Sequence, residues 1–277
     1  MSTIEEDDGQ DLTRKQRREQ ARARRKELEE AEAASAVRRT RLIQLGIVAG
    51  VVVAIIVVIV VATGGGSKKG PATSKHQENA VTSQVNTLIG GIPQSGSTLG
   101  SPSAPVTMQY FADLECPICR DFTEGALPTL ISTYVRPGKL KIEFRSLQTA
   151  TREPETFKTQ QVAALAAGKQ QKAWYYIELF YHEQGEENSG YVTENYLQKL
   201  ASEVPGLNLA KWASDRSDGQ LANAVTTDAQ AASNQGFTGT PSFLLGKTGG
   251  ALHKFEYSSV TDASSFTSAI DSELKKR

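Results

Sequence analysis

An uninterrupted apolar segment divides the chain and constrains its fold more than any other feature. Residues 42–63 read LIQLGIVAGVVVAIIVVIVVAT, which is 22 residues without a single charge. A helix of this length rises about 33 Å, which is enough to cross a hydrocarbon core of roughly 30 Å. Strands and buried helices of water-soluble domains are shorter, at about 4–14 residues. The segment therefore predicts one transmembrane helix.

Basic residues lie mainly on one side of this segment, and they predict its orientation. Those shortly before it are Arg22, Arg24, Arg25, Lys26, Arg38, Arg39 and Arg41, and those shortly after it are Lys68, Lys69 and Lys75. Because positive residues stay inside, we expect a single-pass protein of the cell membrane with a cytoplasmic N-terminus and an extracytoplasmic C-terminal part. A cleaved signal peptide is the competing interpretation. Its apolar region would be only about 7–15 residues long and would not follow a long polar stretch, so we favour an uncleaved signal anchor.

The regions around the apolar segment differ in composition. Residues 1–41 have an acidic start and then a stretch rich in Arg, Lys, Glu and Ala without an apolar stripe, which predicts a solvated cytoplasmic tail. Lys and Arg together number 31, as do Asp and Glu, so no overall positive charge indicates a nucleic-acid partner. Residues 64–85 are rich in Gly, Ser, Thr and Lys and predict a flexible linker. Residues 86–277 are expected to form the folded domain.

Residue patterns within this last part predict an α/β domain. Strands are expected at 106–111, 140–145, 242–245 and 253–257. Helices are expected at 116–135, where Pro128 introduces a kink, and at 262–275. Between about 155 and 234 the chain shows only helical runs. The order of these elements predicts an α/β fold with a helical insertion.

The chain has two cysteines, Cys116 and Cys119, in one Cys-Pro-Ile-Cys tetrapeptide. A zinc site would need two further ligands, and the three histidines are scattered along the chain. A structural bridge across so short a loop would constrain the unfolded chain little. The tetrapeptide follows a predicted strand and opens a predicted helix, whose unpaired N–H groups favour a thiolate on the first cysteine. This context predicts a redox pair, in which an exposed Cys116 exchanges with substrate and a more buried Cys119 resolves the mixed disulfide.

Thr240 and Pro241 form a second candidate element, just before the predicted strand at 242–245. Proline is unusual at the entry to a strand because it cannot donate a hydrogen bond to the ladder. A cis bond between Thr240 and Pro241 would explain this position. It would also leave the preceding backbone free to pair with an extended substrate.

Together these motifs resemble the DsbA-like branch of the thioredoxin superfamily. The similarity rests on YFADLECPIC at 110–119, on the long helical insertion and on GFTGTPSF at 236–243. It covers about residues 85–277, and the lead-in GGIP at 90–93 is similar to that of membrane-anchored members. The resemblance implies a thioredoxin-like fold with an inserted helical subdomain, preceded by one transmembrane helix.

The resemblance also implies roles for individual residues. Cys116 would be the nucleophile and Cys119 the resolving cysteine. Pro241 would be a cis-proline facing them, and the backbone of Thr240 would pair with the bound peptide. The implied activity is that of a thiol–disulfide oxidoreductase that introduces disulfides into exported proteins without a bound cofactor. Its partners would be cysteine-containing exported proteins and a membrane redox partner that reoxidises or reduces the cysteine pair.

The neighbours of the cysteines depart from the strongest oxidants of this family. The dipeptide Pro117-Ile118 carries no histidine that would stabilise the thiolate. The carboxylate of Glu115 is expected to raise the pKa of the adjacent thiol. Both features predict a milder oxidant, because a less stabilised thiolate means a less stabilised reduced form.

Other polar and aromatic residues are secondary candidates. Tyr110 stands where thioredoxins carry a buried acid, so Asp113 and Glu143 are considered for proton transfer, although surface carboxylates of this kind are common. An aromatic group at helical spacing predicts core packing of the insertion, with a substrate groove as the alternative; it comprises Trp174, Tyr175, Tyr176, Phe180 and Tyr181.

Other functions stay open on the sequence alone. A thiol reductase or isomerase fed by a membrane electron donor fits the same motifs. A non-catalytic, membrane-tethered peptide-binding module would keep the fold, but it has no use for a second, buried cysteine. A third hypothesis gives the main role to the Arg-rich cytoplasmic tail, with the outer domain as a sensor.

Overall fold

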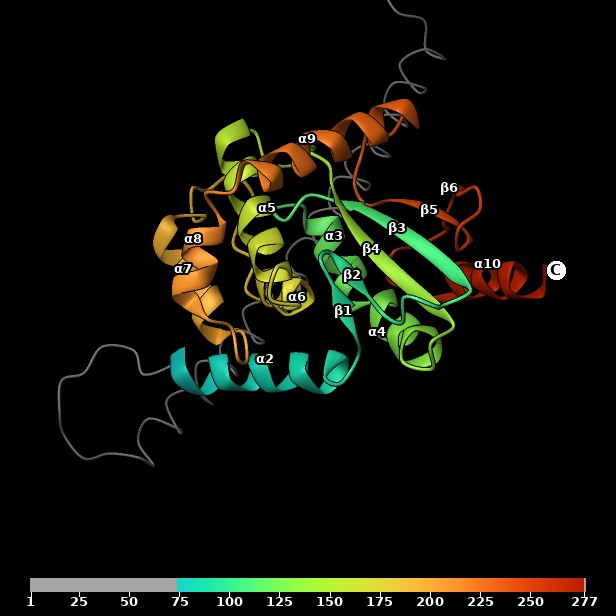
Figure 1. Ribbon diagram of the computed structural model, residues 1–277, viewed down its shortest axis with the longest axis horizontal. Helices are drawn as coiled ribbons and strands as arrows, with labels where there is room; N and C mark the ends of the chain where they lie inside the picture. Colours follow the sequence, from blue (N-terminus) through green and yellow to red (C-terminus); the bar gives the residue numbers. More distant parts are fainter. Residues whose placement is uncertain (1–73, 277) are drawn as a thin grey trace, which may run out of the picture. The chain divides into compact units, whose positions relative to one another are not determined.

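The computed structural model describes residues 74–276 (Figure 1). The predicted cytoplasmic tail at 1–41 and the predicted transmembrane helix at 42–63 lie outside this range. Among the helices of the described range, none is both long enough and apolar enough to span a membrane. The described range contains the domain that the residue patterns predict.

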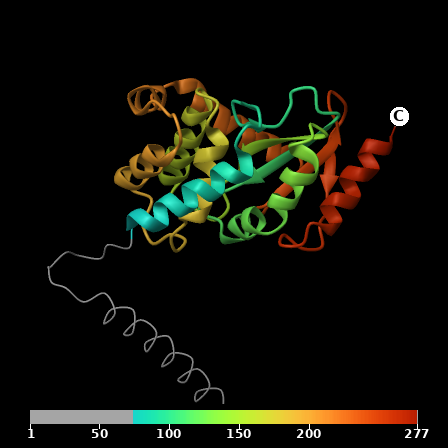
Figure 2. The same ribbon diagram turned by 90° about the horizontal axis from the view of Figure 1, so that it is seen from below.

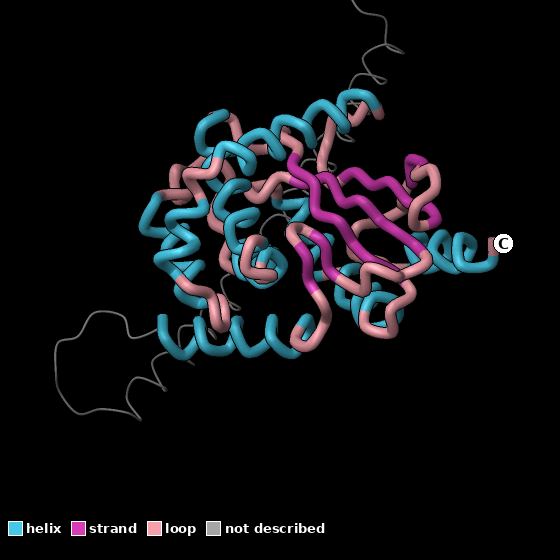
Figure 3. Tube along the Cα trace, in the orientation of Figure 1, coloured by secondary structure: helices cyan, strands magenta, loops and turns pink. Residues whose placement is uncertain are grey.

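A mixed six-stranded sheet forms the centre of the domain (Figure 3). Its strands follow one another in the order β1-β2-β4-β3-β5-β6. Their bounds are β1 Gln94–Ser95, β2 Thr98–Leu99, β3 Val106–Ala112, β4 Leu140–Ser146, β5 Ser242–Lys247 and β6 His253–Phe255. The predicted strands at 106–111, 140–145 and 242–245 are confirmed, whereas the one predicted at 253–257 ends at residue 255. The sequence does not indicate β1 and β2, since strands of two residues are too short to show alternation.

Helices surround the sheet. Their bounds are α2 Ser74–Ile89, α3 Pro117–Glu124, α4 Ala126–Leu130, the π-helical turn η1 Ile131–Val135, α5 Pro154–Gly168, α6 Ala173–His182, α7 Glu194–Glu203, α8 Leu209–Asp215, α9 Gly219–Asn234 and α10 Ser264–Lys275. In two perpendicular views, α7 and α8 lie at one end of the domain and α10 at the opposite end, beyond the sheet (Figures 1 and 2). Residues 154–234 form helices joined by loops and contain no strand, which confirms the helical insertion.

The central strand β3 is covered on both faces. Tyr110 and Phe111 are both fully buried, and they point to opposite faces because side chains alternate along a strand. On one face Tyr110 stacks on Phe243, with ring centroids 5.4 Å apart, inside the main hydrophobic core. On the other face Phe111 belongs to a smaller cluster with Leu244 and with Ala232 of α9. Burial on both faces explains why apolar residues predominate in β3.

Helix α2 corrects the predicted extent of the linker. The composition of residues 64–85 predicts flexibility, but residues 74–85 belong to α2. The side chains of Val85 and Ile89 are 1% and 0% exposed and join the main hydrophobic core. The Arg136 guanidinium holds the end of this helix by donating to its last backbone oxygens. Composition misleads here because two apolar positions one turn apart are enough to dock an otherwise polar helix.

The predicted kink at Pro128 falls earlier in the chain. Helix α3 ends at Glu124, and the backbone breaks at Gly125 before α4 begins. Proline disturbs a helix at the carbonyl four residues before it, which here belongs to Glu124. Glycine is required at the break, because a Cβ at Gly125 would lie 2.6 Å from the Cα of Thr261.

The aromatic group of α6 is buried, as its helical spacing predicts: Trp174, Tyr175, Tyr176, Phe180 and Tyr181 are at most 7% exposed. Trp212 of α8 joins it in the core. Trp174 and Trp212 are 0% and 1% exposed. Each indole N–H donates to a backbone oxygen at 2.8 Å, that of Ser97 for Trp174 and that of Ala163 for Trp212. The first of these bonds fixes α6 against the β1–β2 hairpin, because Ser97 lies in its turn.

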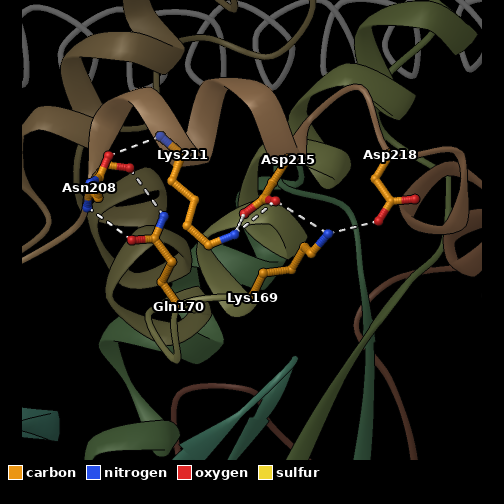
Figure 4. A network of polar contacts seen from close by, with 6 residues as sticks. All are labelled: Lys169, Gln170, Asn208, Lys211, Asp215 and Asp218. Atoms are coloured by element: carbon orange, nitrogen blue, oxygen red, sulfur yellow. Dashed lines mark hydrogen bonds and ion pairs between the residues drawn. The ribbon is translucent and has the colours of Figure 1, made fainter.

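A surface network of polar contacts joins α8 to the end of α5 (Figure 4). Lys169 Nζ lies 3.3 Å from Asp215 Oδ1 and 2.8 Å from Asp218 Oδ2. The side chain of Gln170 exchanges two hydrogen bonds with the backbone of Asn208, at 3.0 and 3.1 Å. Exposed ion pairs contribute little to the free energy of unfolding. The main effect of this network is therefore to hold α8 against the end of α5.

Replacing Ile89 by Ala should lower the free energy of unfolding by about 2–4 kcal/mol, because it leaves a cavity under α2. Both tryptophans of the chain lie in the domain core, so their fluorescence can follow thermal unfolding of the full chain. The exposed Gln84 on the same helix provides the matched control. Gln84→Ala should change the free energy by less than about 0.5 kcal/mol. Equal stability of the two variants would contradict the docking of α2 on the core.

Candidate active site

The ends of neighbouring strands bring distant segments together at one edge of the sheet. Strands β3 and β4 run parallel, with Ala112 opposite Ser146, so their carboxyl ends share this edge. Strand β5 runs antiparallel to β3, with Ser242 opposite Phe111, so it begins at the same edge. The turn before α3, the loop after β4 and the segment before β5 therefore meet here.

The two cysteines lie at the start of α3. Cys116 is the N-cap residue, with φ −72° and ψ 119°, and Pro117 opens the helix. Cys119 lies one turn further along, and both thiols are free. The exposed fractions are 5% for Cys116 and 0% for Cys119. The predicted burial of Cys119 is confirmed, but the prediction of an exposed Cys116 is wrong, because the segment that carries Thr240 packs against its sulfur.

The thiols of this pair have opposite pKa shifts. The pKa of Cys116 is lowered to about 7, chiefly by its hydrogen bond with Cys119, against the effect of burial. The Thr240 hydroxyl and the first backbone N–H groups of α3 also lower it. Burial raises the pKa of Cys119 well above its usual range. At neutral pH, Cys116 is therefore partly thiolate whereas Cys119 keeps its proton.

Pro117 and Ile118, between the cysteines, differ in exposure. Pro117 is half-buried at the first position of the helix, where its missing N–H costs no hydrogen bond. Ile118 is 45% exposed and is one of two large apolar side chains that are exposed among the described residues. Its backbone N–H is one of the groups that lower the pKa of Cys116. The dipeptide therefore acts on the thiol through its backbone and presents an apolar side chain to solvent beside it.

The pKa of the thiol beside Glu115 is lowered, whereas the sequence predicts that this carboxylate raises it. The Glu115 side chain is 2% exposed, and Oε1 accepts the backbone N–H of Asn188 at 3.2 Å. Burial raises the pKa of this carboxyl group. Together with Thr151 and Arg152 it lines a surface pocket between the start of α5 and the loop after α6. The prediction of a raised thiol pKa is wrong, because hydrogen bonds to Cys116 lower it to about 7.

Thr240 and Pro241 face the cysteines. The peptide bond between them is cis, as predicted. The backbone oxygen of Thr240 lies 3.5 Å from Cys116 Sγ. The Tyr257 hydroxyl donates to the backbone oxygen of Pro241 at 3.0 Å and holds this segment from the other side. The two sequence motifs thus come into contact, and the pairing of the Thr240 backbone with a peptide stays a prediction.

Asp113 organises the turn that precedes the cysteines. Its side chain is fully buried, and Oδ2 accepts the backbone N–H groups of Thr149, Ala150 and Thr151 at 3.0, 2.9 and 2.9 Å. Oδ1 accepts the Thr151 hydroxyl at 2.6 Å and the backbone N–H of Glu115 at 3.1 Å. A buried carboxylate requires such donors, because burying it without them would be very costly. Asp113 is therefore an anchor that binds the loop after β4 to the cysteine turn.

Tyr110 and Tyr181 place hydroxyl groups beside the resolving cysteine. Both side chains are fully buried. The Tyr110 hydroxyl lies 3.4 Å from the backbone oxygen of Cys119 and 3.4 Å from the Tyr181 hydroxyl, which donates to the backbone oxygen of Asp113 at 3.2 Å. Burial raises the pKa of both phenols well above their usual range. They are therefore neutral hydrogen-bonding groups where thioredoxins carry an acid.

Three residues of this site carry no signal in the sequence. Thr149 and Gln184 lie in segments without a motif, and Tyr181 is indistinguishable from the aromatic core residues around it. Gln184 Nε2 donates to the backbone oxygens of Leu114 and Cys116 at 2.7 and 3.2 Å. These residues act on a turn about 30 to 70 positions away in the chain, so only the tertiary structure reveals them.

A CxxC pair at a helix start, with one depressed and one raised thiol pKa, faces a cis-proline at the edge of a thioredoxin-like sheet. This fold and site define a thiol–disulfide oxidoreductase. The family described as Thioredoxin matches residues 94–263, which is more than half of the chain. The chain belongs to this family.

Named relatives and solved structures agree with this class. Probable disulfide bond formation protein D of Bacillus cereus is 27% identical over 182 residues, covering 65% of this chain and 79% of that protein. Disulfide bond formation protein D of Bacillus subtilis is 28% identical over 130 residues, or 44% of this chain and 56% of that protein.

The structural neighbours include oxidised BdbD from Bacillus subtilis, with a TM-score of 0.56 and 19% identity over 67% of this chain and 98% of that chain. Wolbachia pipientis alpha-DsbA1 gives a TM-score of 0.54 and 20% identity over 64% of this chain and 90% of that chain. At this level of identity the structures support the fold, including the helical insertion.

Alkylation of the reduced full chain should distinguish the two thiols. The rate at Cys116 is expected to rise with pH around a midpoint near 7, because the thiolate reacts and the pKa of this thiol is depressed. Cys119 should stay unmodified in the native protein, because it is fully buried and protonated. Mass spectrometry after iodoacetamide pulses from pH 5 to pH 9 measures both rates. In the unfolded chain both should react with midpoints near about 8.5, and a native Cys116 that titrates there contradicts the site geometry.

Proposed function

We propose that the chain is an extracytoplasmic thiol–disulfide oxidase that introduces disulfides into exported proteins. A substrate thiolate attacks the sulfur of Cys116 in the oxidised pair, a mixed disulfide forms, and Cys119 leaves and takes up a proton. A second substrate thiolate then attacks the substrate sulfur of the mixed disulfide, and Cys116 leaves as a thiolate. The substrate loses two electrons and gains a disulfide, and the Cys116–Cys119 pair is reduced to two thiols.

The observation that carries disulfide exchange in this proposal is the contact of Cys116 Sγ with the segment before the cis-proline, beside a fully buried Cys119. A thiol of low pKa leaves a mixed disulfide faster, which helps the second step. The same stabilised thiolate favours the reduced form of the pair and makes its disulfide more oxidising. The hydrogen bond with Cys119 contributes most to the stabilisation of this thiolate, and no histidine between the cysteines adds to it.

The relatives support the same direction of electron flow. The similar proteins of Bacillus cereus and Bacillus subtilis carry names that refer to disulfide bond formation. Disulfides form and persist outside the cytosol, which fits an outward-facing domain. The pair must be reoxidised after each cycle, and we assign this step to a membrane redox partner.

The alternative in the same class is a reductase or isomerase that receives electrons from a membrane donor. The protonated, fully buried Cys119 is compatible with this alternative, because the same resolving thiol takes part in both the oxidation and the reduction of a substrate. A non-catalytic peptide-binding module is less favoured, because opposite pKa shifts of two adjacent thiols have no use in binding alone.

We further propose that residues 42–63 anchor the domain in the cell membrane, with residues 1–41 in the cytoplasm. The length and apolarity of the segment support a span, and the basic residues before it support this orientation.

The reduction potential of the pair in the full chain should lie near about −120 to −180 mV, where dedicated oxidants and isomerases lie. Equilibration with glutathione buffers, followed by an alkylation mass shift, measures it. The oxidised chain should also transfer one disulfide per molecule to reduced, unfolded ribonuclease, and Cys116→Ser should abolish transfer. A potential near about −270 mV, without transfer, would favour the reductase.

The proposed anchor predicts that the full chain stays with membranes after extraction with alkaline carbonate. Because an apolar helix of this length cannot dissolve in water, a variant without residues 42–63 should appear in the soluble fraction. External protease should degrade the domain in spheroplasts while sparing an epitope tag at residue 1. Protection of the domain from protease in intact spheroplasts would contradict the proposed orientation.

A further inference from the structure

A surface pocket adjoins the cysteine turn on its N-terminal side. Its volume is about 350 Å³, and it lies between the start of α5 and the loop after α6. Pockets that bind ligands begin at about this size. Glu115, the residue directly before Cys116, is one of the residues that line it.

The pocket lies within reach of a polypeptide bound at the nucleophile. On one side, Glu115 is a single residue away from Cys116. On the other side, Thr151 lines the pocket two residues beyond Thr149, whose hydroxyl oxygen is 2.5 Å from that of Thr240. Consecutive Cα atoms are about 3.8 Å apart, and an extended chain advances about 3.3 Å per residue. A substrate side chain two or three positions from the reacting cysteine therefore falls beside the pocket.

Asn188 holds the walls of the pocket together. Its Oδ1 accepts the backbone N–H of Arg152 at 2.8 Å, and its Nδ2 donates to the backbone oxygen of Ala150 at 3.0 Å. Its own backbone N–H donates to Glu115 Oε1 at 3.2 Å. The loop after β4, the loop after α6 and the cysteine turn are thus joined through one residue. A pocket held in this way is formed before the ligand arrives, which lowers the cost of binding.

The carboxylate of Glu115 is buried but poorly paired. It is 2% exposed, and among the described residues its one hydrogen bond is the bond from Asn188 to Oε1. The Thr151 hydroxyl lies close enough to lower its pKa, but this hydroxyl donates to Asp113 at 2.6 Å. Asp113, which is also buried, accepts hydrogen bonds at both of its oxygens. Because a buried carboxylate is costly without donors, a donor that enters the pocket would stabilise Glu115.

The charges around the pocket favour a cation. Its lining contains the carboxylates of Glu115 and Glu153 against the one guanidinium of Arg152. Burial raises the pKa of Glu115, and the negative charges of Asp113 and Glu187 raise it further. A positive group beside Glu115 would oppose these effects, whereas a second anion would add to them.

We propose that this pocket binds a lysine or arginine side chain of the polypeptide whose cysteine forms the mixed disulfide, and that Glu115 is the specificity-determining residue. The ammonium or guanidinium group donates to the Glu115 carboxylate, and the apolar stem lies along Val192, which also lines the pocket. The inference rests on the proposed function only in taking Cys116 as the nucleophile. It adds a preference for substrate cysteines that have a cationic residue two or three positions away.

The test compares peptides that each contain one cysteine, activated as a mixed disulfide with thionitrobenzoate. They react with the reduced full chain that carries Cys119→Ser, so that one thiol is left. The Cys116 thiolate attacks the peptide sulfur, a peptide–Cys116 disulfide forms, and thionitrobenzoate leaves as a thiolate whose absorbance gives the rate constant.

The peptides differ only two and three positions from the cysteine, where they carry lysine, norleucine or glutamate. Norleucine keeps the four-carbon chain of lysine without its charge. The lysine peptide should react roughly fivefold faster than the norleucine peptide, and the glutamate peptide should react more slowly than both. Because the same thiol attacks every peptide, its own reactivity cancels in these ratios. A lysine moved about eight positions from the cysteine lies beyond the pocket and should give the norleucine rate.

Two variants assign the preference to one carboxylate. Glu115→Gln keeps an oxygen that can accept the Asn188 N–H but removes the charge, so the ratio of the lysine to the norleucine rate should fall to near one. The matched control is Glu187→Gln, which removes an exposed charge of the loop after α6 that does not line the pocket. It should keep most of the preference, and tryptophan fluorescence reports folding of both variants.

Several results would overturn the proposal. They are equal rates for lysine and norleucine peptides, a faster glutamate peptide, a preference that persists when lysine is moved away, an unchanged ratio in Glu115→Gln, or an equal loss in Glu187→Gln. The first three need no substitution in the pocket, so they decide the matter even if Glu115→Gln does not fold.

The proposed oxidase function fails or holds separately. A natural chain that does not oxidise reduced ribonuclease, while the lysine preference is present, keeps the cation pocket and loses the oxidase assignment. A chain that oxidises ribonuclease but reacts equally with all peptides keeps the oxidase assignment and loses the pocket.

Discussion

The pairing of β3 with β4 on one side and with β5 on the other is the constraint on which the rest of this site depends. The parallel and antiparallel registers bring the end of β3, the end of β4 and the start of β5 to the same edge of the sheet. A one-residue slip in either register would reverse the faces of the paired side chains and move the cysteine turn away from Pro241. Burial of β3 on both faces makes such a slip costly, since apolar contacts fix its register.

The buried carboxylate of Asp113 converts this arrangement of strands into a defined active site. It would be unstable in the interior without hydrogen bonds, and the amides of the loop after β4 supply them. This requirement locks the loop against the turn that ends in Cys116. Thr149 then lies beside Thr240, whose backbone oxygen contacts Cys116 Sγ.

Burial raises the pKa of both thiols, and hydrogen bonds outweigh it at only one of them, which gives the reaction its order. Cys119 lies in the interior beside neutral phenols, so burial dominates and its pKa rises. Cys116 is almost as well covered, yet hydrogen bonds from Cys119, Thr240 and the helix start outweigh the effect of burial. The cysteine that meets substrate is therefore the better leaving group, and its partner holds a proton until the mixed disulfide is resolved.

The sequence by itself determined the α/β class, the main strands, the helical insertion, the redox pair and the cis bond at Thr240–Pro241. These follow from local patterns, because alternation, helical runs and proline chemistry act over a few residues. The tertiary structure alone decided the docking of α2, the burial of Cys116, the engagement of Glu115 by Asn188 and the contacts of Asp113, Tyr181 and Gln184 with the cysteine turn. Each of these depends on contacts between segments far apart in the chain, and the thiol pKa values follow from the same contacts.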